Sequence, residues 1–222
     1  MDWSALKLSF LLALATTVVL IPLAVVVARP LAWGHFRGKS MVEALIALPL
    51  VLPPTVLGFY LLSAFSTNST LGHAYQSLTG RALVFSFDGL LLASLIFNLP
   101  FAVQPVQRAF DAIPREVRDA AWCCGLTRWQ ALWRIELPLA WPGILAAIVL
   151  TFAHTLGEFG VVLMVGGNIG GETRTVAISI YDRVHSFDDH GAAVMSAMLV
   201  AFSFVAITLF HMLTKRPDRY RE

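Results

Sequence analysis

The sequence predicts an all-α integral membrane protein, and two observations carry that prediction. Of the 222 residues, 57% are hydrophobic and only 14% are charged, and the mean hydropathy is +0.72. A soluble domain of this length could not bury so much apolar surface. Charge-free apolar stretches also recur at roughly 20 residues, the helical length that crosses the hydrocarbon core of a bilayer. We therefore expect a single transmembrane domain over residues 1–222.

Five spans are expected, each set by a long apolar run. The second span carries three prolines, so it should be kinked or locally unwound. The third is interrupted by Asn98 and Pro100, and the fourth contains His154 and Glu158. The five runs are Leu8–Ala28, Met41–Phe65, Gly89–Val106, Leu139–Val165 and Gly191–Leu213.

Two further segments connect these spans. Ser66–Arg81 is rich in Ser, Thr, Asn and Gly, and reads as a loop. Glu172–His185 would be a sixth span only if it dipped into the membrane, and its charges favour a surface or re-entrant helix instead. The first apolar run is too long for a cleavable signal peptide and lacks a small-residue cleavage site.

The basic residues predict the orientation. Of the 16 lysines and arginines, 12 fall after the first span, between the third and fourth, and after the fifth. This bias predicts an amino terminus outside and a carboxyl terminus in the cytoplasm. The loop at about residues 108–138 and the tail 214–222 are then cytoplasmic.

Within that loop, Asp119–Pro138 is a polar island patterned as two short helices. Apolar and small residues recur at helical spacing from Ile113 to Cys124, and Gly125 sits where a first helix needs a left-handed stop. Thr127 and Gln130 form a capping box for a second helix, which Pro138 is expected to end. The spaced residues of the first helix are Ile113, Val117, Ala120, Ala121 and Cys124.

This island resembles the cytoplasmic motif of ABC importer membrane subunits, which reads EAA, three residues, Gly, nine residues, Ile, one residue, Leu-Pro. Every spacing fits, and the one departure is Asp119 in place of Glu. The matching residues are Asp119, Ala120, Ala121, Gly125, Ile135, Leu137 and Pro138. The resemblance implies a type I importer permease fold in which the first of these helices sits in a cleft of a cytoplasmic ATPase dimer.

The chain has no GxxxxGK[ST] phosphate loop, so ATP and Mg²⁺ would be bound by the separate ATPase, with no cofactor and no catalytic residue in this chain. We expect Trp129, Leu132 and Trp133 to pack the second helix on the membrane domain. No HExxH or GxSxG motif supports a membrane enzyme. A secondary transporter is the remote alternative, and it would leave Asp119–Pro138 unexplained.

Two stretches, Leu48–Leu62 and Leu156–Val184, resemble molybdate importer permeases. Sulfate permeases share a similar G-E-F-G segment, so a sulfate, thiosulfate or tungstate importer remains the alternative. Residue physics does not separate these tetrahedral dianions. The resemblance further implies a bacterial inner-membrane location, a homodimer in the bilayer, and a periplasmic or surface solute-binding protein as partner. No nucleic-acid partner is expected.

Two groups of residues are candidates for the pathway and for docking. We expect Thr55, Asn98 and the backbone near the second-span prolines to line the path, although these groups could equally satisfy a kinked helix locally. Glu158 is expected to cap or brace the gate with Arg174, or else to lie in interfacial water without a task. The pathway and gate candidates are Pro53, Pro54, Thr55, Asn98 and Glu158, and the docking candidates are Glu172, Arg174, Asp182 and Arg183.

No metal site is expected from the sequence. His154 has no second ligand at metal spacing, and a hydrogen bond between helices is its expected role. Cys123 and Cys124 are adjacent, which disfavours a disulfide between them. We expect both to be reduced packing residues. The docking candidates could also be no more than a solvated surface.

Overall fold

The structure, a computed structural model, describes the backbone of residues 2–214 and the side chains of 2–205, 207, 208 and 212. Within these residues every regular element is a helix, as the sequence predicts. The first eight are α1 (Trp3–Trp33), α2 (Lys39–Val51), α3 (Pro54–Phe65), α4 (Thr70–Thr79), α5 (Phe87–Phe97), α6 (Leu99–Asp111), α7 (Arg115–Cys123) and α8 (Arg128–Ala131). The rest are the π-helix η1 (Leu132–Glu136), α9 (Leu137–Gly157), α10 (Gly160–Gly166), α11 (Val176–His185) and α12 (Asp189–Thr214).

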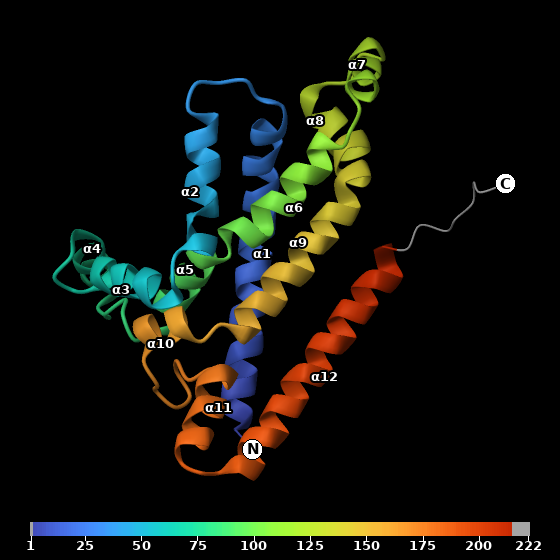
Figure 1. Cartoon of the computed structure of the whole chain (residues 1–222). Helices are drawn as coiled ribbons and strands as arrows, with labels where there is room; N and C mark the ends of the chain where they lie inside the picture. The colour runs from blue at the N-terminus through green and yellow to red at the C-terminus, as the bar shows by residue number, and fades with distance from the viewer. Residues whose placement is uncertain (1, 215–222) are drawn as a thin grey trace.

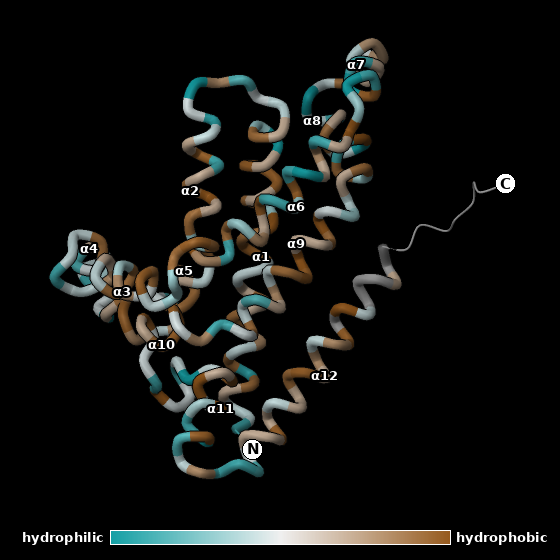
Figure 2. Tube along the Cα trace, viewed as in Figure 1, coloured by the Kyte–Doolittle hydropathy of each residue, from teal (hydrophilic) through white to brown (hydrophobic). Residues whose placement is uncertain are grey.

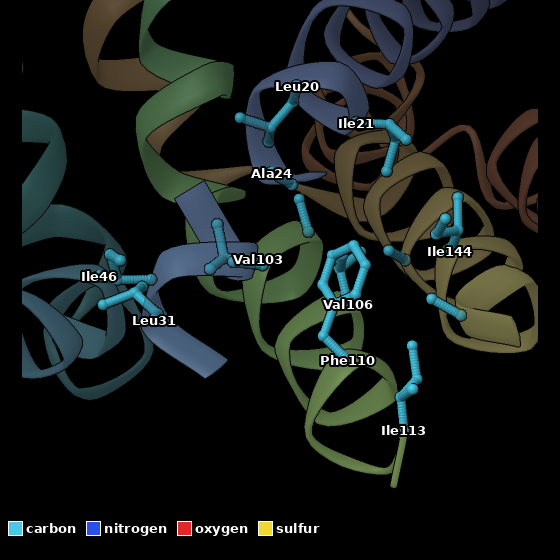
Figure 3. Close-up of a cluster of buried hydrophobic side chains, with 14 residues drawn as sticks. Leu20, Ile21, Ala24, Leu31, Ile46, Val103, Val106, Phe110, Ile113 and Ile144 are labelled. Atoms are coloured by element: carbon cyan, nitrogen blue, oxygen red, sulfur yellow. The ribbon is translucent and has the colours of Figure 1, made fainter. Parts of the chain in front are cut away.

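Helices α1, α6 and α9 pack against one another in the half of the bundle nearer α7. Their contact is a core of apolar side chains, several of which are shown in Figure 3. A second apolar core joins α1 to α3, α5 and α10. The turn with α7 lies at one end of the molecule, and the amino terminus and α11 lie at the other (Figure 1). Figure 2 shows hydrophobic residues along α1, α9 and α12.

The lengths and hydropathies of the helices support the membrane assignment. α1 (31 residues) and the continuous Arg128–Gly157 (30 residues) are each long and apolar enough to cross a membrane. The pairs α2–α3 and α5–α6 meet the same test when each pair is taken as one bent span. In α12, Asp189–Val205 is a shorter apolar helix. All five predicted apolar runs are therefore helical, although the fourth does not have the predicted extent.

The second predicted span, Met41–Phe65, is sharply kinked, as its prolines predict. Its two halves, α2 and α3, meet at an angle of 111°. Leu52 and Pro53 are extended at the break, because the ring of each following proline disfavours helical geometry in the residue before it. α3 therefore runs across the bundle while α2 runs along it (Figure 1).

The Ser66–Arg81 segment, which the sequence predicts to be a loop, contains the short helix α4. Ser69 caps this helix by accepting a hydrogen bond from the Gly72 N–H at 2.9 Å, and Gly80 ends it with φ of +73°. The segment is rich in Ser, Thr and Gly, which is typical of a loop, but two caps set the bounds of a short helix within it.

The third predicted span breaks at Asn98 as expected, with a bend of 41° between α5 and α6. The fourth is shorter than predicted, because α9 ends at Gly157 and Glu158 is extended. The chain then forms the separate seven-residue helix α10. The Glu172–His185 segment contains the ten-residue α11, too short to cross a bilayer.

Candidate functional site

The polar island folds as the predicted helical hairpin, and its turn is a Schellman motif. Gly125 has φ of +75°. Its N–H donates to the Trp122 carbonyl at 2.9 Å, and the Leu126 N–H donates to the Ala121 carbonyl at 3.2 Å. These two bonds satisfy carbonyls at the end of α7, and the left-handed residue between them favours glycine. The capping box of Thr127 and Gln130 is present, as predicted.

The second helix of the hairpin does not end at Pro138, contrary to the prediction. It passes through the π-helix η1 and continues as α9. Pro138 has no N–H to donate to the carbonyl four residues earlier, and the preceding π turn provides a different pairing, from the Leu137 N–H to the Leu132 carbonyl. Pro138 consequently stands in the first turn of α9, where proline is tolerated.

The motif residues divide between an outward and an inward face of the hairpin. Asp119, Ala120 and Gly125 are exposed, whereas Ala121 is buried inside the hairpin. A methyl group built on Gly125 would meet no atom within 4 Å. Beyond the turn, Ile135 and Leu137 are half-buried and Pro138 is exposed.

The hairpin carries an exposed ion pair and two exposed aromatic rings. Asp119 pairs with Arg115 at 3.6 Å. Trp129 and Trp133 are exposed and contact each other with ring centroids 5.9 Å apart, so their predicted packing on the membrane domain is wrong. Leu132, as predicted, packs against the α1–α6–α9 core.

Three residues at the base of the hairpin were missed by sequence reasoning. The Arg29 guanidinium donates two hydrogen bonds to the Glu136 carboxylate, at 2.7 and 2.9 Å. Trp33, one turn after Arg29, contacts the start of the hairpin. No spacing rule joins positions 107 residues apart, although an acid in the motif and a base at the end of an apolar run were visible signals.

Asn98 lies in a buried polar network at the α5–α6 break. Its amide donates to the Ser94 carbonyl and to Thr155 Oγ1, each at 2.9 Å. Its carbonyl oxygen lies 3.0 Å from His154 Nδ1, as expected for a histidine that bridges helices. Asn98 is fully buried, so this arrangement matches the alternative of local satisfaction around a broken helix.

A cavity of about 230 Å³ lies where three breaks meet, between α2 and α3, α5 and α6, and α9 and α10. His154, Glu158 and Pro54 line it, whereas Pro53 and Thr55 are exposed and do not. Glu158 accepts a hydrogen bond from the Val161 N–H at 2.9 Å, so it caps α10. Its expected partnership with Arg174 is wrong, because that side chain pairs elsewhere.

A larger groove of about 660 Å³ follows α6 and α9. Prolines and small side chains form most of its wall, and Gln104 and Arg108 add polar groups. The two helices cross closely here, since a methyl group on Gly143 would come within 2.4 Å of Ala109 Cβ. Sequence reasoning did not single out these residues.

Three of the four docking candidates make internal ion pairs. Arg174 lies 3.9 Å from Asp2 and 3.8 Å from Asp182, and Arg183 pairs with Asp188. Glu172 is exposed.

The Asp2 carboxyl is a titrating group in this cluster. Burial acts to raise its pKa, but hydrogen bonds from Ser4, the Ala5 N–H and Ser179, together with Arg174, outweigh burial and hold the pKa below its ordinary value. The ionised carboxylate is therefore the form that ties the amino terminus to α11.

Among the described residues, no group of three or more His, Cys, Asp or Glu side chains is placed to hold a metal ion. Cys123 and Cys124 are free and exposed, so the expectation that they are packing residues is wrong.

The bundle of broken helices with a helical hairpin at one end is a fold also seen in chains of ABC transporters. A solved chain with this fold belongs to a bacterial ABC transporter involved in the import of the acidic polysaccharide alginate, with a TM-score of 0.76, 15% identity, and coverage of 96% of this chain and 79% of that one. Another comes from inward-facing MetNI, the methionine ABC transporter, with a TM-score of 0.70, 17% identity and coverage of 96% and 92%.

Residues 20–219 match the family described as "Binding-protein-dependent transport system inner membrane component", and the chain belongs to that family. It is 44% identical to the molybdenum transport system permease protein ModB of Azotobacter vinelandii, over 93% of this chain and 91% of the relative. It is 36% identical to ModB of Haemophilus influenzae, over 99% and 96%. The sulfate transport system permease protein CysT of Synechocystis is 30% identical, over 98% and 76%.

Proposed function

We propose that this chain is the permease subunit of an ATP-driven importer of molybdate. The hairpin supports the proposed coupling to an ATPase. It presents Asp119, Ala120 and Gly125 on an exposed surface at one end of the bundle. Small residues at an exposed turn allow close approach of a partner backbone. We assign this surface to a separate ATPase, which binds ATP and Mg²⁺ while this chain contributes no catalytic residue.

The choice of molybdate rests on the relatives named as molybdenum permeases, which reach 44% identity over nearly the whole chain. Sulfate is the second candidate, because relatives named as sulfate permeases reach 31% identity. Arg108 offers a positive charge to either dianion from the groove along α6 and α9. Specificity between the two would lie mainly in the solute-binding protein.

The assembly we propose contains two copies of this chain. Five passes of one chain are too few to enclose a gated path, and a two-fold axis is the common way to complete one. The α7–α8 end faces the cytoplasm, because that loop, the segment after the first span and the tail after the fifth together hold 12 of the 16 lysines and arginines. The amino terminus, α11 and Glu172 then face the solute-binding protein, outside the inner membrane.

Reconstitution with the ATPase and the molybdate-binding protein tests this proposal. ATP hydrolysis is compared with molybdate, tungstate and sulfate on the binding protein, and the mass of the solubilised permease gives its copy number. We expect molybdate to stimulate hydrolysis most. A response to sulfate alone would favour the second candidate, and failure to retain any ATPase subunit would contradict the proposal.

A further inference from the structure

We call the helical hairpin of α7, α8 and η1, residues 115–136, the coupling hairpin. The carboxyl-terminal end of α1 contacts both the start and the end of this hairpin. At the start, Trp33 Nε1 donates to the Phe110 carbonyl at 3.1 Å, where α6 ends. The Arg118 guanidinium of α7 lies over the Trp33 ring, 4.3 Å from its centroid. At the finish, Arg29 binds the Glu136 carboxylate at the end of η1. Residues one turn apart on α1 therefore hold both attachments of the hairpin.

The contact between Arg29 and Glu136 should stay intact when the coupling hairpin moves. The Glu136 side chain is only 5% exposed and that of Arg29 is 30% exposed, so water does not compete for the carboxylate. The two hydrogen bonds form a fork that fixes orientation as well as distance. Separating such a pair leaves a buried charge without a partner, which is unfavourable. Rotation of the hairpin base is therefore passed to α1 rather than lost in a loose contact.

The opposite end of α1 is also attached. Ser9 Oγ accepts a hydrogen bond from the buried Val176 N–H, at the start of α11, at 2.8 Å. Asp2 adds contacts to Ser179 at 3.3 Å and to Arg174 at 3.9 Å. The 31 residues of α1 span about 46 Å at 1.5 Å per residue. One helix thus joins the coupling hairpin to the far face of the bundle.

We propose that Arg29, Trp33 and Glu136 form a clamp that passes movement of the coupling hairpin to α1, and through α1 to α11. These are positioning residues, and the inference rests on the proposed function, because it requires an ATPase that moves the hairpin. The clamp is distinct from the ATPase-binding surface, since Glu136 is buried while Ala120 and Gly125 are exposed. Loosening it should leave ATP hydrolysis running and reduce the transport that hydrolysis drives.

The test uses the complete transporter in proteoliposomes, with this chain, its ATPase and the molybdate-binding protein. Molybdate uptake and ATP hydrolysis are measured in the same vesicles, giving ATP consumed per molybdate imported. Glu136→Gln removes the charge and keeps the shape, while Arg29→Lys keeps the charge and loses the fork. Glu43→Gln is the matched control, because the pair of Glu43 with Lys39 of α2 is more exposed, at 4.0 Å, and a glutamine can still accept the hydrogen bond that Gln107 Nε2 donates to Glu43 at 2.8 Å.

We expect Glu136→Gln to raise the ATP consumed per molybdate about tenfold, within the usual range of coupling between sites, with the ATPase still co-purifying. Arg29→Lys should fall between the wild type and Glu136→Gln, and Glu43→Gln should match the wild type. An unchanged ratio in an assembled Glu136→Gln transporter would overturn the clamp. Failure of both clamp variants to assemble would also overturn it, because the pair would then serve folding alone. Absence of ATP-driven uptake by the wild type would instead refute the proposed function.

Discussion

Replacing Gly125 with leucine distinguishes two effects. One is on the stability of the permease fold, and the other is on the affinity of the joint with the ATPase. Gly125 has φ of +75° and no atom within 4 Å of an added Cβ. A leucine there strains only the backbone, at about 1–2 kcal/mol for a non-glycine residue in left-handed geometry. The permease alone should therefore still insert and purify as a folded protein.

The same side chain should also weaken the joint with the ATPase. Overpacking a close contact costs typically about 1–3 kcal/mol. That energy corresponds to a loss of affinity of roughly fivefold to 150-fold. Gly80→Leu is the matched control, because Gly80 has φ of +73°, has no atom within 4 Å, and ends α4 away from the hairpin.

Titration of the purified ATPase against both variants in nanodiscs measures these affinities. We expect Gly80→Leu to bind as the wild type does, and Gly125→Leu to bind at least fivefold more weakly. Thermal unfolding of the two permeases, measured without the ATPase, should give similar midpoints. Equal ATPase affinities for Gly125→Leu and Gly80→Leu would refute the assignment of the hairpin as the joint.

Three other predictions concern the bundle. Gly143→Leu should destabilise it by about 1–3 kcal/mol, because the new Cβ overlaps Ala109, whereas Gly157→Leu, with open space around its Cβ, should cost less in the same thermal assay. Asn98→Leu should also destabilise it, by about 1–3 kcal/mol, because buried partners lose their hydrogen bonds. The Asp2 pKa is lowered on folding, so its contribution is present above the ordinary value of 3.8 and is lost as pH falls through the folded pKa. Hydrogen exchange in the first turn of α1 should show that loss, and Asp2→Asn should abolish its pH dependence.

For each of these three predictions, one outcome would contradict it. Equal stability of the two glycine variants would mean that α6 and α9 do not cross closely at Gly143. An Asn98→Leu permease as stable as the wild type would show that water or other groups replace the amide. Acid-induced exchange that persists in Asp2→Asn would place the titrating group elsewhere.

Local signals in the sequence predicted the hairpin turn and the break in the third span. A left-handed glycine and a capping box act through bonds between residues only a few positions apart, so their pattern survives in one dimension. Asn98 followed by Pro100 marked the α5–α6 break for the same reason. The resemblance to a known importer motif then suggested a role for this turn, which residue physics alone did not.

Other features depend on contacts that no local pattern records. The apolar run after Leu139 continues through Val165, so hydropathy did not reveal that α9 stops at Gly157 and that Glu158 caps a new helix. The Arg29–Glu136 pair joins positions 107 apart. Trp129 and Trp133 were assigned to the membrane domain because apolar residues favour burial, yet an exposed hairpin places them outside.

We propose above that this chain imports an oxyanion using ATP hydrolysed by a separate subunit. Uptake of molybdate into proteoliposomes containing the chain, its ATPase and the molybdate-binding protein tests it most directly, with and without ATP supplied on the ATPase side. We predict uptake that requires ATP and both partners, and that Gly125→Leu reduces. Uptake that proceeds equally well without ATP, or without the ATPase subunit, would contradict ATP-driven import by this chain.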